Sequence, residues 1–423
     1  MKLWVIAALL APQESDDLLA RFRERIKDTL KRVPDYTCAE TVTRSRRTGS
    51  QGVFQSLDVL RLQVALIGGR ERYAWPDARQ FDERDLRDLV GKGVIGTGNF
   101  SDHARHVMLS PHAQFTLRGA EEIRGRRALR VDYEVPVEFS SYKLRIPPEE
   151  AEVGVKGAFW VDVQTLDLLR LEVNADEVPP ELGVAELRET IEYSRQPVGD
   201  ADFLLPFASE VTLVSLDEQH HRNQIRVEAC RQYRADSTIR FEAAPETAPA
   251  AAPVAVAKLN GPLPNNLRFQ LAIDHDIEPE KAAAGDVVRA VVTRPVRRGE
   301  QVIVPEGARV HGRLVRIEKG ASPFPHYVVA IELHTLELEG SSHEFNATMQ
   351  DAGPASGLLR QQKRLDPVFT RKRATRFDIL VREKPRGEGV LHWDAKQPRI
   401  KRGLRMLWVT GAGDPTGAES ERQ

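Results

Sequence analysis

One stretch near the middle of the chain, residues 241–258, limits what the sequence can fold into. It places Pro245, Pro249 and Pro253 among alanines and has no apolar periodicity. Each proline fixes its own backbone and removes a hydrogen-bond donor, and alanine side chains are too small to build a core. The stretch is therefore predicted to be a semi-extended linker with a folded domain on each side.

The rest of the chain is long enough for two such domains. It has 423 residues, of which 41% are hydrophobic and 29% charged, so both flanks can bury a core. We expect domains over residues 12–240 and 259–412 and a disordered tail over residues 413–423. No apolar run approaches the length that spans a bilayer.

The overall charge of -1 hides a small asymmetry between the two parts. Residues 259–423 hold 26 Lys and Arg against 21 Asp and Glu, which leaves 35 against 41 in residues 1–258. Neither part is strongly basic, which argues against nucleic acid as a partner.

The first eleven residues have the order of a secretory signal peptide. Lys2 precedes the apolar stretch Leu3–Leu10, and the small residue Ala11 follows. This order predicts export to the periplasm or cell envelope of a bacterium. The alternative is that these residues cap the core of the first domain.

Cys38 and Cys230 are the only cysteines, and both fall in strand-like segments near the ends of the first domain. In an exported protein an even cysteine count favours a disulfide, so we expect these two to be bonded. Two unrelated buried thiols are the alternative.

The first domain begins with an amphipathic pattern over residues 15–33. Ser15 is a plausible N-cap, Phe22 and Ile26 belong to the apolar stripe, and Pro34 ends the helix. A second helix is expected over residues 83–90. Short extended segments make up the remainder, at residues 36–44, 55–66, 70–75, 128–135, 155–163, 168–173, 185–193, 208–216 and 224–234.

The most informative segment is a hairpin over residues 157–173. Phe159 and Val161 alternate on one face, a polar turn follows, and Leu169 and Leu171 are expected to return on the same face. A helix followed by a long meander with this hairpin resembles the lipoprotein-carrier family, in which a curved half-barrel sheet wraps a helix. The resemblance covers residues 15–240.

The resemblance implies a cavity for acyl chains or another hydrophobic ligand on the concave face. The residues expected to line it are on the helix and the hairpin: Phe22, Ile26, Phe159, Val161, Leu169 and Leu171. The alternative is that these six side chains form a closed core.

The second domain is predicted to consist of many short strands separated by turns. Its apolar residues show almost no helical periodicity. The strands are expected at residues 267–273, 286–293, 301–304, 309–317, 329–338, 345–349, 389–393 and 404–408, with a bulge at Thr335. This pattern is typical of a small barrel or sandwich. The segments Ala284–Val288 and Val302–Gly312 look like the β-barrel domain of type IV secretion and conjugation scaffold proteins.

Candidate catalytic and metal motifs are weak throughout. The glycines of residues 91–96 do not follow a strand, so they do not indicate a dinucleotide site. His103, His106 and His112 lack a helical frame and a nearby cysteine, which makes solvated loop histidines the better interpretation. We therefore predict no catalytic residue, no metal and no cofactor, although carboxylate-based catalysis would leave no local signature.

The strongest charge feature is a basic run in the second domain. It consists of Arg360, Lys363, Arg364, Arg371, Lys372, Arg373 and Arg376. Such a run is usually a solvated face, and its alternative is contact with an anionic membrane surface or an acidic envelope protein.

These observations predict a mainly β (α+β) protein that is not an enzyme. An N-terminal helix wrapped by a curved antiparallel half-barrel sheet is followed by a small all-β barrel or sandwich. The expected function is binding of a lipid, lipoprotein or other hydrophobic ligand in the first domain. The alternative is a structural or docking module of an envelope or secretion assembly.

Overall fold

The computed structural model describes residues 12–76, 81, 86, 100–146, 148–233, 262–320, 324–359 and 387–411. The chain divides into two compact units, Met1–Ile239 and Arg240–Gln423. The predicted signal peptide, linker, C-terminal tail and basic run lie outside the described residues, as does most of the predicted second helix.

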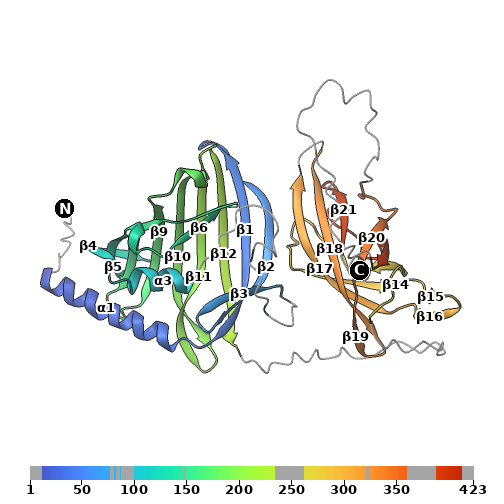
Figure 1. The fold of residues 1–423 in the computed structure, drawn as a ribbon, viewed down its shortest axis with the longest axis horizontal. Coiled ribbons are helices and arrows are strands. Elements are labelled where there is room, and N and C mark those ends of the chain that lie inside the picture. Colours follow the sequence, from blue (N-terminus) through green and yellow to red (C-terminus); the bar gives the residue numbers. More distant parts are fainter. Residues whose placement is uncertain are drawn as a thin grey trace, which may run out of the picture. The chain divides into compact units, whose positions relative to one another are not determined.

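Unit 1 is a long antiparallel sheet that curls around a helix (Figure 1). Its ten described strands are hydrogen-bonded in the order β3-β2-β1-β12-β11-β10-β9-β8-β5-β4. Their bounds are β1 (Tyr36–Thr48), β2 (Gln55–Ile67), β3 (Arg70–Ala74), β4 (Gln114–Ile123), β5 (Arg126–Val135), β8 (Gly154–Asp162), β9 (Leu168–Asp176), β10 (Val184–Val198), β11 (Ala201–Ser215) and β12 (Gln219–Gln232). The predicted helix-in-half-barrel fold is thus confirmed.

Helix α1 (Pro12–Arg32) covers the concave face together with α3 (Phe100–Met108). Phe22 and Ile26 are buried on it, as the apolar stripe predicts. The helix begins three residues earlier than predicted, with Pro12 in the first turn, where its missing N–H costs nothing. Ser15 therefore lies inside the helix and is not its N-cap.

The sequence pattern does not predict four elements of unit 1: β4, α3 and the two strands of a small hairpin. Helix α3 occupies part of the segment predicted to be a loop, and its apolar positions amount to little more than two turns. Most side chains of β4 are exposed or half-buried, which leaves only a weak apolar pattern. The small hairpin, β6 (Lys143–Ile146) with β7 (Glu149–Glu152), and the 3-10 turns Val137–Phe139 and Pro180–Leu182 complete the unit.

The predicted disulfide is confirmed. Cys38 on β1 is bonded to Cys230 on β12, and their Cα atoms are 4.1 Å apart. The two strands are also hydrogen-bonded neighbours in the sheet. The bond therefore fastens the first strand of unit 1 to its last one.

The hairpin between β8 and β9 differs from the prediction at one position. Trp160 is opposite Arg170 and Val161 is opposite Leu168, which leaves Leu169 as the extra residue of a bulge. Leu169 packs in a small cluster with Ile123, Ala128, Ala158 and Trp160. Since Ala158 and Trp160 alternate with Phe159, this cluster is on the other face of the sheet, and the prediction that Leu169 shares the face of Phe159 and Leu171 is wrong.

Unit 2 is a second antiparallel sheet that curls into a small barrel. Its principal strands follow the order β19-β18-β17-β14-β13-β22-β20, and β21 pairs with β18 while lying beside β20, which brings the two ends of the sheet together. The bounds are β13 (Arg268–Ile273), β14 (Val287–Val292), β15 (Val296–Arg298), β16 (Gln301–Val304), β17 (Arg309–Gly320), β18 (His326–Leu338), β19 (Ser341–Glu344), β20 (Ala347–Ala352), β21 (Glu388–Asp394) and β22 (Arg405–Thr410).

The interior of this barrel is apolar and aromatic. Phe269, Phe345, Trp393 and Trp408 are almost completely buried, and the rings of Phe269 and Phe345 meet edge to face with their centres 4.9 Å apart. The predicted bulge is present, because His311 and Gly312 face Thr335 and Leu333, which leaves one residue of β18 unpaired. The prediction of a small all-β barrel or sandwich is confirmed, since this unit consists of β-sheets in which β18 is a single strand.

Candidate functional site

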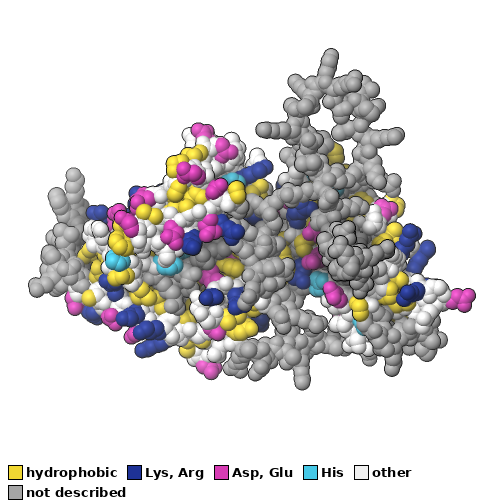
Figure 2. Space-filling view, viewed as in Figure 1, with side chains coloured by type: hydrophobic (Ala, Val, Ile, Leu, Met, Phe, Trp, Pro, Cys, Tyr) yellow, Lys and Arg dark blue, Asp and Glu magenta, His cyan; other side chains and the backbone are white. Residues whose placement is uncertain are grey.

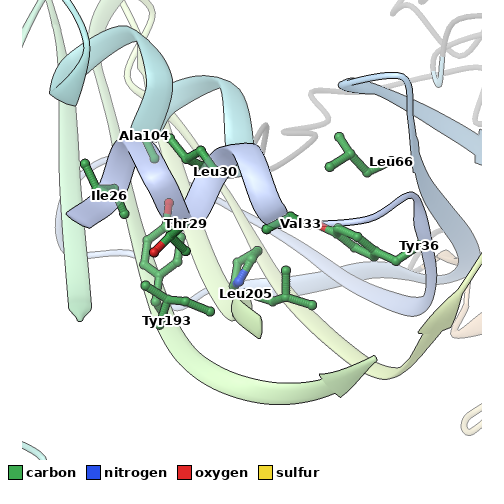
Figure 3. Close-up of a pocket in the computed structure, with 11 residues that line it drawn as sticks. Ile26, Thr29, Leu30, Val33, Tyr36, Leu66, Ala104, Tyr193 and Leu205 are labelled. Carbon is green, nitrogen blue, oxygen red and sulfur yellow. The ribbon is translucent and has the colours of Figure 1, made fainter. Parts of the chain in front are cut away.

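An apolar pocket lies beneath the C-terminal half of α1 in unit 1 (Figure 3). Its cavity volume is about 30 Å³, and about 440 Å³ of space, open solvent included, lies between its lining atoms. Its walls come from four strands and both helices: Ile26, Thr29, Leu30, Val33, Tyr36, Leu66, Ala104, Tyr193, Leu204, Leu205 and Pro206. Thr29 and the hydroxyls of Tyr36 and Tyr193 are the polar groups of this lining.

The positions of these residues follow from the local fold. Ile26, Leu30 and Val33 recur on one side of the last turns of α1, as the amphipathic pattern requires. Tyr36 is opposite Leu66 in the register of β1 and β2, so both side chains project from the same face of the sheet. Ala104 adds a small side chain from α3, which leaves room in the pocket where a larger residue would fill it.

The structure distributes the six predicted ligand residues differently. Only Ile26 lines the pocket. Phe22 and Phe159 are fully buried and stacked, with ring centres 5.4 Å apart, and Val161 and Leu171 are buried too. Apart from Leu169 on the other face, these residues close the sheet onto α1 one helical turn before the pocket begins.

A buried ionisable pair lies on the concave side between α3 and the sheet. His103 Nε2 is 2.9 Å from an oxygen of Glu189 on β10, and the side chains of both are 5% exposed. Ser209 Oγ donates a hydrogen bond to the other Glu189 oxygen at 3.3 Å, and the Tyr142 ring packs on His103. His103 is thus a buried anchor of α3 and not the solvated loop histidine that the sequence suggested.

Glu40 on β1 is the second buried acid of this interior. It is 1% exposed, and neither of its carboxylate oxygens has a hydrogen-bond partner in the part of the chain that the structure describes. Burial, and next the nearby Glu71 carboxylate, raise the pKa of Glu40 well above its ordinary value. The side chain therefore carries its proton at pH values where an exposed glutamate is ionised.

Sequence reasoning missed both groups, although one of them left a signal. Glu40 alternates with Cys38 and Val42, both of which are buried, so period-2 patterning alone places it on the inner face. No sequence pattern indicated His103. Its partner Glu189 is distant in sequence, and the helix that carries His103 is short.

Unit 2 has a wider, polar hollow on its surface. It encloses about 820 Å³ that is largely open to solvent, and its walls include Asp276, Glu278 and Lys281. These groups are already engaged, since Lys281 pairs with Glu278 and Arg399 with Asp276. Across the described residues, no cluster of His, Cys, Asp or Glu side chains is arranged to hold a metal ion.

The other features predicted from the sequence are two histidines, a basic run and a group of glycines. His112 is exposed and stacks on Phe139, with ring centres 4.0 Å apart, and His106 is exposed on α3. The basic run and the glycines of residues 91–96 lie outside the described residues. In the part of the chain that the structure describes, no helix is long and apolar enough to cross a membrane.

Comparison with solved structures finds similar folds for about half of the chain. A LolA superfamily protein from Nitrosomonas europaea matches with 10% identity and a TM-score of 0.26, covering 52% of this chain and 93% of that one. A domain described as outer membrane lipoprotein-sorting, from Vibrio parahaemolyticus, matches with 10% identity and a TM-score of 0.27, covering 50% and 90%.

Both neighbours are of the lipoprotein-carrier kind that the hairpin resembles. At these TM-scores the similarity does not assign the chain to their family. No known protein family and no curated protein matches the sequence.

Proposed function

We propose that unit 1 binds a hydrophobic ligand, such as the acyl chain of a lipid or lipoprotein, in the pocket beneath α1. The observation that supports the proposal is the composition of the pocket, in which leucines, isoleucine and valine outnumber a few polar groups at one side. Ligand sites are typically concave and mostly apolar with a small number of oriented polar groups. The tyrosine hydroxyls would then meet the polar end of the ligand.

The interior around the pocket favours the same function. Leu204 and Leu205 are already buried, whereas Leu30 is only half-buried. A ligand that covers Leu30 would gain part of the roughly 1.5 to 3 kcal/mol by which full burial of a large apolar side chain stabilises a fold. The disulfide joins β1 to β12, which are adjacent strands inside the curved sheet.

We also propose that the protein acts in the periplasm or cell envelope. The disulfide supports this location, since such bonds persist in oxidising compartments, and the signal-like order of the first eleven residues agrees with it.

The test is uptake of a polyene fatty acid whose fluorescence rises in an apolar site. Ala104→Phe should fill the pocket from α3 and weaken uptake by about tenfold or more, which corresponds to about 1.4 kcal/mol. Ala20→Phe is the matched control, because Ala20 is exposed on α1 and the same side chain there leaves the pocket open.

Equal uptake by the two variants would contradict the pocket as the site. A wild-type protein that takes up no such probe would instead favour the alternative function, a docking module in which the filled interior of unit 1 serves only to support its surface.

A further inference from the structure

Two hairpins meet at one end of the sheet of unit 1. The β1–β2 and β11–β12 connections are joined there by a hydrogen bond from the Gly49 N–H to the Glu218 carbonyl, at 2.9 Å. On β1 and β12, Ser45 is opposite Arg222 and Arg47 is opposite His220. Arg47 and Arg222 are therefore diagonal neighbours on the same face of the sheet.

Phe54, from the loop before β2, lies between these arginines, and we call the three residues the arginine–phenylalanine cluster. The guanidinium carbon of Arg47 is 4.6 Å from the centre of the Phe54 ring, and that of Arg222 is 4.0 Å from it. Both distances are within the range of cation–π contact. One aromatic ring thus holds two like charges close together.

No carboxylate neutralises the cluster among the described residues. Neither Arg47 nor Arg222 forms an ion pair there, and the nearby Asp58 is engaged by Arg44, whose Nε donates to it at 2.7 Å. Asp217, in the adjacent turn, accepts a hydrogen bond from Ser215. Several other arginines of unit 1 are paired, as Arg126 is with Asp162 and Arg195 with Asp167, and Figure 2 shows the two signs intermixed on the face in view.

The donor groups of the cluster are also incompletely used. The Nε atoms of both arginines are buried without a hydrogen-bond partner. Their terminal amino groups donate no hydrogen bond within the described residues and are not buried, so they face solvent. Two guanidinium groups on one ring, whose outer donors have no acceptor among the described residues, lack the anion that would balance them.

We propose that the arginine–phenylalanine cluster binds a phosphate group. Guanidinium forks match the spacing of phosphate oxygens, and a phosphate has enough oxygens to accept from both arginines at once. The phosphate can belong to a phospholipid head group or to a small soluble molecule. This site is separate from the apolar pocket, so either proposal can fail without the other.

The experiment measures two ligands with the full chain at constant ionic strength. Calorimetric titration with glycerol 3-phosphate reports soluble phosphate, and cosedimentation with phosphatidylglycerol vesicles, against phosphatidylcholine vesicles, reports the head group. The double variant Arg47→Gln/Arg222→Gln should weaken the binding by about tenfold or more, because it removes both charged forks. Phe54→Leu keeps the charges but removes their platform, and an intermediate loss is expected.

The matched control removes two charges that no carboxylate pairs. Arg226→Gln/Arg268→Gln changes exposed strand positions, one on each unit, and should leave binding at the wild-type level. Binding to glycerol 3-phosphate alone would identify a soluble ligand, and binding to phosphatidylglycerol alone a lipid head group. Absence of both, or an equal loss in the control, would overturn the proposal and leave the cluster as a support for the hairpin.

A second measurement tests the site on the wild-type protein, in case the double variant does not fold. In the wild-type protein, phosphate should protect Arg47 and Arg222 from an arginine-specific reagent, while Arg226 reacts as before. Peptide mass spectrometry gives the modified fraction at each position. Equal modification with and without phosphate would contradict the site.

Discussion

The two units of this protein cover the concave faces of their sheets in different ways. Unit 2 closes its sheet on itself and fills the inside with Phe269, Phe345, Trp393 and Trp408. Unit 1 leaves its sheet open, covers it with two helices, and buries Glu40, His103 and Glu189 among the apolar residues. The described part of unit 2 also buries the polar side chains of Arg313, Thr348 and Thr410, but it buries no acid. A half-barrel, in contrast to a closed barrel, keeps space that helices and ligands can share.

The comparison indicates where function resides. Buried acids cost free energy unless a partner compensates them, so their concentration in one of two otherwise similar sheets points to a role other than stability. In the proposed function unit 1 holds the ligand, and unit 2 is a separate closed fold. Predictions that alter one unit and spare the other test this division.

The largest effect is expected from removing the disulfide, which belongs to unit 1 alone. The double variant Cys38→Ser/Cys230→Ser opens a link between residues separated by 192 positions. In the chain-entropy description this costs up to about 5 kcal/mol, with 2 to 4 kcal/mol more common. Urea unfolding followed with signals from each unit should show a loss confined to unit 1.

A thiol titration checks the premise of this prediction. Non-reduced wild-type protein should contain no reactive thiol, even when it is unfolded. Two titratable thiols, or a loss of stability shared by both units, would contradict the bond or the independence of the units.

The next effect concerns the core of unit 2. Trp408 is fully buried in the barrel, and Trp408→Ala should destabilise this unit by about 3 to 5 kcal/mol through the cavity it leaves. The Trp408 Nε1 atom is buried without a hydrogen-bond partner among the described residues. Trp408→Phe, which removes that unsatisfied donor and keeps most of the volume, should therefore cost much less.

Thermal unfolding of both variants measures the difference, with ligand uptake by unit 1 as the control. Uptake should remain at the wild-type level. If Trp408→Ala also abolished uptake, the two units would be coupled and the division between them would be wrong.

How much of this could be predicted from the sequence depended on periodicity. The stripe of Phe22 and Ile26 predicted the helix, and the alternation of Phe159 and Val161 predicted the hairpin, because each pattern repeats over several residues. The bulge at Leu169 was not predictable, since one extra residue changes the facing of a side chain without altering composition. Cys38 and Cys230 were paired correctly by counting alone.

The candidate site was located less well than the fold. Its walls combine α1, α3 and strands that are far apart in sequence, so Leu66, Ala104 and Leu205 carry no shared local pattern. The ligand site was predicted at the most apolar segment, around Phe159. In the folded protein this segment is part of the closed core. The pocket lies next to this closed core, at a place where side chains no longer fill the interior. No pattern in the sequence indicates such a place.

The smallest of the three effects concerns Glu40 and tests whether the polar interior of unit 1 has a cost. Because burial and Glu71 raise its pKa in the folded state, Glu40 keeps a proton that an unfolded glutamate, with a pKa of 4.5, loses. The folded state therefore binds more protons. The stability that Glu40 contributes is fully present below pH 4.5 and falls as the pH rises towards the folded pKa.

Glu40→Gln removes this dependence of stability on pH. Relative to wild type, the variant should be similar near pH 4 and more stable near pH 8, because each pH unit between 4.5 and the folded pKa costs the wild type about 1.4 kcal/mol. Urea unfolding across that range measures it, and Glu228→Gln, which changes an exposed position on the neighbouring strand β12, is the control. Parallel stability curves for wild type and Glu40→Gln would mean that the Glu40 charge has a partner in solution, such as a cationic group of a bound ligand, and that the interior of unit 1 is compensated after all.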